Sequence, residues 1–127
     1  MDDKLMYFAV SNSTNDLEFD FPYKGGSTLS IIVRNMNKEN DVMLQISKGQ
    51  FGSSYSQKVK IKFDDGKIES YSFSDAADGS SNYIFLENSK SLIAKLKAAK
   101  HLKIEAPFFQ AGRQVAEFDV SGFEWPH

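Results

Sequence analysis

Apolar and polar residues alternate along most of the chain, a pattern typical of β-strands that bury one face. Alternation predicts strands at Leu5–Ala9, Leu17–Phe21, Val42–Ile46, Leu102–Ala106 and Val115–Val120. Two further strands are predicted from a β-branched run at Thr28–Val33 and at Tyr83–Leu86. We expect Pro22 and Pro107 to end two of these strands, because proline has no N–H to donate to a sheet. Breaks are expected at Gly25-Gly26, Asn35–Asn40 and Lys48-Gly49.

The clearest hairpin is predicted at Val59–Phe73. Its first strand alternates Val59, Ile61 and Phe63 with lysines, and Asp64-Asp65-Gly66 supplies the turn, since glycine tolerates the positive φ that tight loops need. The returning strand is expected at Lys67–Phe73, followed by a polar loop at Ser74–Ser81.

One stretch has helical spacing instead. Leu92, Ile93, Leu96 and Ala99 predict a helix at about residues 89–100. We expect the side chain of Asn88 or Ser89 to cap its first turn. The apolar face should pack on residues drawn from Val59, Ile61, Phe63, Leu102, Ile104, Phe118 and Val120.

These elements predict a mainly β (α+β) fold. The chain of 127 residues fits one domain, 1–127. We expect an antiparallel β-sandwich or a barrel-like sheet of about eight strands, with one helix in the C-terminal half. No apolar run approaches the ~20 residues that a transmembrane helix needs, so we expect no transmembrane segment.

Composition narrows the chemistry. The 15 basic and 17 acidic residues give a formal net charge of −2, which argues against a nucleic-acid partner. The lack of cysteine excludes disulfides, cysteine-ligated metals and thiol catalysis. The one Trp, five Tyr and eleven Phe are enough to fill a core.

Candidate acids and bases are few. Glu117 and Asp119 are two residues apart on a predicted strand and so share one face, as a general acid/base pair in a small hydrolase would. A solvated strand face explains them better. His101 follows the helix with no nucleophile motif near it, which favours a polar residue at a helix end. We therefore predict no catalytic residue and a protein that is not an enzyme.

Ligand-binding motifs are also lacking. The oxygen-rich loop Asp75–Ser80 lacks the alternating acids and the distal glutamate of a calcium-binding EF-hand loop. No phosphate-binding glycine motif occurs. The sequence therefore predicts neither a cofactor nor a metal.

The nucleic-acid alternative rests on Lys58, Lys60 and Lys62. On a small β-barrel these lysines would follow a single strand's phosphates, with Tyr55 or Tyr71 stacking on a base. Alternating lysines also protect an exposed edge strand, and this second interpretation is favoured.

A candidate partner contact lies at Phe108, Phe109 and Arg113. Two consecutive phenylalanines cannot both face inward on a strand, so one is expected at the surface. An exposed phenylalanine near an arginine is a plausible protein-binding anchor, although burial of Phe109 under a loop explains the pattern equally well.

The C-terminal half resembles a family. The motifs are the hairpin VKIKFDDG (Val59–Gly66), the helix LIAKLKAAK (Leu92–Lys100) and the last strand FDVSGF (Phe118–Phe123). They resemble small bacterial envelope proteins of the VasI/TagO type, associated with type VI secretion, and the invasion-associated locus B group. The likeness covers about half the chain. Cysteines common in these proteins near Ser53–Gln57 are missing here.

The resemblance implies a non-enzymatic envelope protein that binds another protein. It is expected to be a secretion-associated accessory or an immunity- or inhibitor-type protein. The resemblance also implies a periplasmic protein or an outer-membrane-anchored lipoprotein. Because Met1–Lys4 shows no signal peptide, this location requires that the signal has been removed, and a cytoplasmic protein is the alternative. The partner's identity and the oligomeric state are left open.

Overall fold

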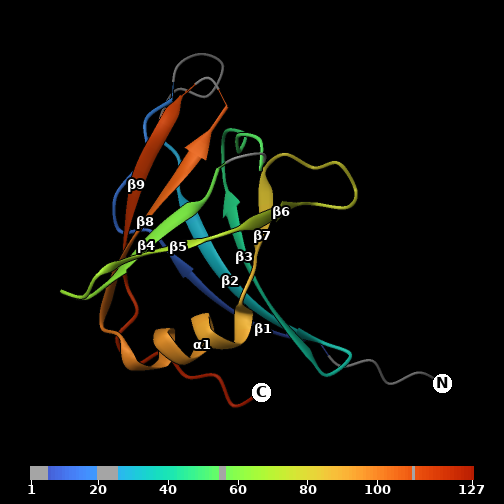
Figure 1. Cartoon of the computed structure of the whole chain (residues 1–127), viewed down its shortest axis with the longest axis vertical. Coiled ribbons are helices and arrows are strands. Elements are labelled where there is room, and N and C mark those ends of the chain that lie inside the picture. The colour runs from blue at the N-terminus through green and yellow to red at the C-terminus, as the bar shows by residue number, and fades with distance from the viewer. Residues whose placement is uncertain (1–5, 20–25, 55–56, 110) are drawn as a thin grey trace.

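Strands make up most of the ordered structure. The computed structural model describes residues 6–19, 26–54, 57–109 and 111–127, and in these ranges the chain forms nine strands and one helix (Figure 1). In chain order they are β1 (Met6–Asn12), β2 (Leu29–Met36), β3 (Glu39–Ile46), β4 (Val59–Phe63), β5 (Ile68–Tyr71), β6 (Phe73–Asp75), β7 (Tyr83–Leu86), α1 (Ser89–Ala98), β8 (His101–Phe108) and β9 (Gly112–Asp119).

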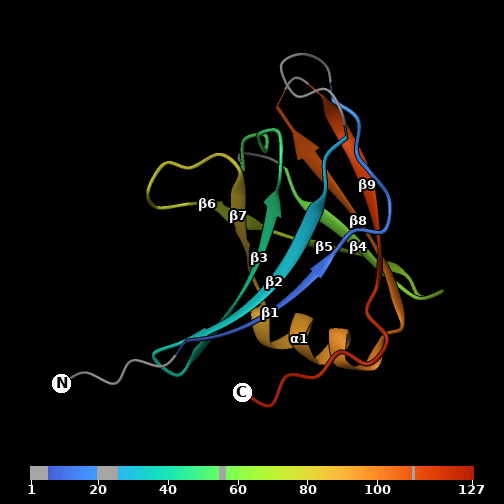
Figure 2. The same ribbon diagram turned by 180° about the vertical axis from the view of Figure 1, so that it is seen from behind.

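The strands form two antiparallel sheets. The first sheet has the order β1-β2-β3-β7-β6 and the second sheet has the order β5-β4-β8-β9. The second sheet faces the viewer in Figure 1 and the first sheet faces the viewer in Figure 2. In the described part of the chain the sheets do not join into a closed barrel. The predicted mainly β sandwich with one helix in the C-terminal half is confirmed.

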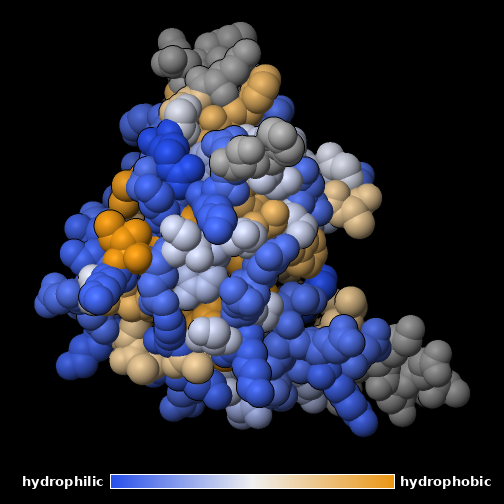
Figure 3. All heavy atoms as spheres, in the orientation of Figure 1, coloured by the Kyte–Doolittle hydropathy of each residue, from blue (hydrophilic) through white to orange (hydrophobic). Residues whose placement is uncertain are grey.

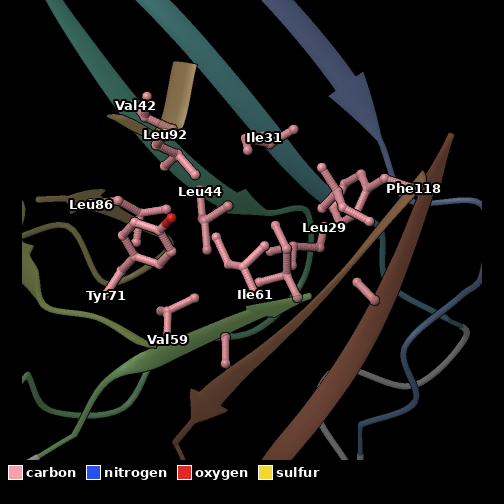
Figure 4. Packing of buried hydrophobic residues seen from close by; sticks show 14 of the residues in the cluster. Leu29, Ile31, Val42, Leu44, Val59, Ile61, Tyr71, Leu86, Leu92 and Phe118 are labelled. Atoms are coloured by element: carbon pink, nitrogen blue, oxygen red, sulfur yellow. The ribbon is translucent and has the colours of Figure 1, made fainter. Parts of the chain in front are cut away.

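The core lies between the two sheets. Alternate residues of β2 and β3 face inward, and they meet inward-facing residues of β4, as Leu44 and Ile61 do in Figure 4. Both of these side chains are fully buried. The period-two alternation of the sequence therefore predicts the inner faces correctly.

Helix α1 covers one end of the core. Leu92, Ile93 and Leu96 are its buried residues, and Leu92 lies beside Val42 and Leu44 of β3 (Figure 4). The predicted packing partners of the helix did not include β3, whose Cα atoms come within 8 Å of those of α1. The helix follows directly after β7, which pairs with β3, and this connection places it there.

The predicted side-chain cap of the helix is wrong. Asn88 occupies the N-cap position with φ 61° and ψ 42°, and its side chain makes no capping hydrogen bond. Its carbonyl oxygen instead accepts the N–H of Leu92 at 3.0 Å. Asparagine is one of the few residues that tolerates this left-handed conformation. The helix ends at Ala98, because Ala99 is already extended.

The prediction of a strand at Leu17–Phe21 is also wrong for residues 17–19, which are the described part of that range. Leu17 and Ser27 form an isolated bridge, with two backbone hydrogen bonds of 2.8 Å. Leu17 and Phe19 are nevertheless buried, so the apolar alternation records burial without a continuous ladder. Phe21, Pro22 and Gly25 lie outside the described residues.

Pro107 does not end its strand, because β8 continues to Phe108. The N–H of Val120 donates to Lys100 O at 2.8 Å, so the β8–β9 ladder bonds run through the even-numbered residues of β8. The nitrogen of Pro107 therefore points to the side where β4 pairs farther along β8 and where Gly52 N–H donates to Pro107 O at 3.0 Å. Since the ladder of β4 reaches only Glu105, no strand there requires an N–H from Pro107.

Two further boundaries differ from the predictions. The returning strand expected at Lys67–Phe73 divides at Ser72, so that β5 belongs to the second sheet and β6 to the first. The break expected at Asn35–Asn40 narrows to Asn37-Lys38, both with positive φ, which is the geometry of a tight two-residue hairpin turn.

Candidate functional site

The predicted partner contact divides between core and surface. Phe108 is buried and stacks on Phe51 with ring centroids 5.1 Å apart, while Phe19 meets it edge to face. Phe109 is 58% exposed. One phenylalanine of the pair thus faces each way, as strand geometry requires, and Phe108 is a core residue instead of a surface anchor.

Arg113 is held by its own sheet. Its Nε donates to Glu105 Oε1 at 2.8 Å, and its Nη2 donates to the carbonyl oxygen of Lys58 at 2.7 Å. The guanidinium therefore ties β9 to β8 and to the segment that enters β4. Because these bonds already use much of its donor capacity, Arg113 serves the second sheet more directly than it serves a partner.

The outer face of the second sheet gathers the predicted acid and base candidates. An open groove of about 760 Å³ is lined by His101, Glu117 and Asp119 together with the turn at Asp64-Asp65. His101 lies opposite Asp119 in the β8–β9 ladder. The structure thus brings together residues that the sequence left apart.

Local hydrogen bonds engage two of the carboxylates in this groove, those of Asp64 and Asp119. Asp64 accepts the backbone N–H groups of His101 at 2.9 Å and Lys100 at 3.1 Å, and these bonds hold the pKa of Asp64 below its ordinary value. Hydrogen bonds from the hydroxyl and the N–H of Ser121 lower the pKa of Asp119. Carboxyls stabilised in the ionised form are the opposite of what a general acid needs.

Glu117 forms an ion pair with Lys103, whose Nζ lies 3.7 Å from Glu117 Oε1. Both side chains are more than half exposed, so this pair contributes little to stability. The predicted interpretation of Glu117 as part of a solvated strand face agrees with this environment.

The lysine stripe lies on the same face. β4 is flanked by β5 and β8, so the favoured interpretation of these lysines as protection of an edge strand is wrong. Lys60 lies opposite Glu105 in the ladder, which breaks the run of positive charge. Tyr71, offered as a base-stacking residue, is buried in the core, and its burial raises the pKa of its hydroxyl. Tyr55 lies outside the described residues.

The oxygen-rich loop binds its own neighbours. Asp78 accepts the hydroxyl of Tyr83 at 2.8 Å and the N–H of Ser80 at 2.9 Å.

Across the described ranges, no group of three or more His, Cys, Asp or Glu side chains is placed to hold a metal ion. No helix in the described part of the chain has the length and apolar character of a membrane span.

The outer face of the first sheet is different in character. Val10, Ile32, Met43 and Phe85 lie side by side on β1, β2, β3 and β7, and we call these four residues the apolar row. Val10 is 58% exposed, and the other three are half-buried. Their neighbours along each strand point into the core, so the apolar row faces away from it.

A charged pair borders the apolar row. Phe8, Arg34 and Asp41 form the next cross-strand set, with Arg34 Nη2 2.7 Å from Asp41 Oδ2. The guanidinium of Arg34 lies over the ring of Phe85, 5.4 Å from its centroid. Its Nε is buried and has no hydrogen-bond partner in the described structure. Phenylalanine, methionine and arginine are all enriched at protein–protein interfaces relative to the rest of a protein surface.

The contrast between the two outer faces is the main feature of the surface. The corresponding cross-strand row of the second sheet is Ile68, Lys62, Lys103 and Glu117, so three of its four residues are charged, where the first sheet has four apolar side chains. Figure 3 shows the side of the molecule that carries the second sheet, and most of its surface is hydrophilic. An antiparallel sheet that faces water on one side normally alternates apolar with polar residues, as the second sheet does.

The sequence did carry a signal for this apolar face. Met6–Val10 and Ile31–Val33 are continuous apolar runs, and such runs are typical of strands covered on both sides.

Comparisons of the chain with protein-family models, curated proteins and solved structures find no match.

Proposed function

We propose that this protein is a non-enzymatic binding protein of the bacterial envelope that uses the outer face of its first sheet to bind another protein. The observation that carries this proposal is the apolar row, which crosses four strands and is bordered by Arg34 and Phe8. Burying the row against a partner would remove its apolar surface from water. Each Å² of apolar surface buried in this way contributes a favourable free energy of about 25 cal/mol.

The chemistry of the face defines the partner. A complementary surface would be apolar at its centre, to cover Met43 and Phe85, and polar at its rim, next to the Arg34–Asp41 ion pair. Depletion of charge at the centre with polar groups at the rim is the usual anatomy of a protein interface. The accessory and immunity or inhibitor classes both act by such contacts.

The compartment is part of the proposal. Periplasmic location, or attachment to the outer membrane, follows from the resemblance of Val59–Phe123 to VasI/TagO-type proteins. The test is to fractionate cells that express the complete natural gene. Recovery with the envelope fraction supports this location, while recovery in the cytosol would refute it without affecting the proposed binding face.

The binding face is tested by site-specific photocrosslinking in the native host. A photoreactive amino acid at Met43 should capture a discrete partner, whereas the same group at Lys103 on the second sheet should not. Met43→Lys should abolish co-purification of that partner. Val115→Lys is the matched control, because Val115 is an exposed apolar residue of the other face. Equal loss in both variants, or equal capture from both positions, would overturn the proposal.

A further inference from the structure

Among the described residues, one backbone edge of strand β1 has no partner. Ser13 N–H donates to Leu29 O at 2.8 Å, and this bond sets the alternation of the β1–β2 ladder. By that alternation the odd-numbered residues of β1 bond to β2. The N–H and C=O groups of Met6, Phe8 and Val10 therefore point away from the sheet. Among the described residues, nothing bonds to the backbone of β1 on that side.

The other edges of the sandwich are short or covered. β6 and β5 have three and four residues. β9 is longer, but the segment after β1 crosses over to its edge, where Thr14 N–H donates to Glu117 O at 2.7 Å. Asn15 adds two more bonds, from its Nδ2 to Val115 O at 3.1 Å and from Glu117 N–H to its Oδ1 at 2.7 Å.

β1 lacks the usual protection of an exposed edge. Its seven residues, MYFAVSN, contain no charge, no proline and no glycine. Phe8 and Val10 project from its outer face with 54% and 58% of their surface exposed. Proteins that keep an edge strand unpaired normally place charges, prolines or bulges there. An uncharged, apolar strand with free donors and acceptors is complementary to a second strand of the same kind.

We propose that β1 pairs antiparallel with β1 of a second copy of this chain, so that the first sheets of two protomers become continuous. The favoured register places Phe8 opposite Val10 of the second copy, and Val10 opposite the second copy's Phe8, about a two-fold axis at Ala9. Both pairs are then of the hydrogen-bonded type, because Phe8 and Val10 carry the outward-pointing groups.

The self-complementary register favours a second copy over an unrelated strand. In this register every outward donor of Phe8 and Val10 meets an acceptor, and no charge on β1 requires a countercharge. Phe8 and Val10 of the two copies also pack as cross-strand apolar pairs on the outer face. The pairing does not depend on the proposed partner-binding function, although it would bring two apolar rows side by side.

Sedimentation equilibrium of the purified protein tests the pairing. The wild-type chain should form dimers at micromolar to millimolar concentration. Phe8→Lys/Val10→Lys places lysine opposite lysine twice and should weaken the dimer by about 100-fold or more. Phe8→Lys/Val10→Glu places lysine opposite glutamate in both pairs and should recover most of that loss. A wild-type monomer at all concentrations, or equal weakening by both double variants, would overturn the proposal.

Two control variants and one further measurement make the result specific. Phe109→Lys changes an equally exposed phenylalanine elsewhere and should leave the dimer intact. Met43→Lys lies two strands from the edge and should also leave it intact, so loss of partner binding is separable from loss of pairing. In wild-type protein, hydrogen exchange at the amides of Phe8 and Val10 should slow as concentration rises. This measurement needs no variant, and the lack of any concentration dependence would refute the proposal.

Discussion

The docking of α1 on the core makes the strongest stability prediction. Leu92 is fully buried and lies against Val42 and Leu44, so Leu92→Ala removes three carbon atoms from a packed site. At about 0.8 kcal/mol per buried methylene, the lost burial amounts to about 2.4 kcal/mol. The remaining cavity brings the expected loss to about 3–4 kcal/mol. Alanine has a higher helix propensity than leucine, so the helix itself is not weakened.

The loss should be visible in both chemical and thermal unfolding. For 127 residues, an unfolding entropy of about 2.1 cal/mol/K per residue converts 3–4 kcal/mol into a fall in Tm of about 11–15 °C. In urea, the midpoint should fall while the slope of the free energy with denaturant stays constant.

The matched control is Lys97→Ala, an exposed position on the same helix, which should change the free energy of unfolding by less than about 0.5 kcal/mol. Lys95 is unsuitable because it pairs with Glu69 and lies over the ring of Phe63. Losses of similar, small size for Leu92→Ala and Lys97→Ala would mean that α1 is not docked as described.

Two further predictions concern turns. Lys38→Gly should raise the free energy of unfolding by about 0.5–1 kcal/mol, because Lys38 has a φ of 65° that glycine adopts without strain. Urea unfolding measures this gain. Glu39→Gly is the control and should lower the free energy of unfolding. Asp64→Asn should make the free energy of unfolding depend less strongly on pH in the acid range. Since the folded pKa of Asp64 is lowered, its carboxylate stabilises the fold above about pH 4, and this contribution is lost as the pH falls through the folded pKa. The stability gap between wild type and Asp64→Asn should therefore be constant near neutrality and shrink below about pH 4, and a gap that widens in acid would contradict the assignment.

Local patterns predicted the inner faces and the helix, because burial follows residue periodicity directly. Ile61 and Leu92 needed no knowledge of the rest of the chain. The errors arise where a long-range partner decides the outcome. Pro107 continues β8 only because β4 has ended beside it, and the run ending at Phe73 divides because its two halves join different sheets.

The candidate site was harder to predict for the same reason. The apolar row takes one residue from each of four strands, so the alternation within any single strand does not reveal it. His101 and Asp119 likewise meet only through the β8–β9 register. By contrast, the exposure of one residue of the Phe108-Phe109 pair follows from strand geometry alone, and the structure confirms it.

One crossing of the chain determines which edge of the sandwich is left open. After β1, the chain passes at Thr14 and Asn15 to the edge of β9, where it bonds to Val115 O and to both backbone groups of Glu117. The same segment cannot also cover β1, the strand it has just left. The uncharged edge of β1 and the apolar row that begins at Val10 are therefore adjacent, so one folding event leaves both the free backbone groups and the apolar surface on the same side of the first sheet.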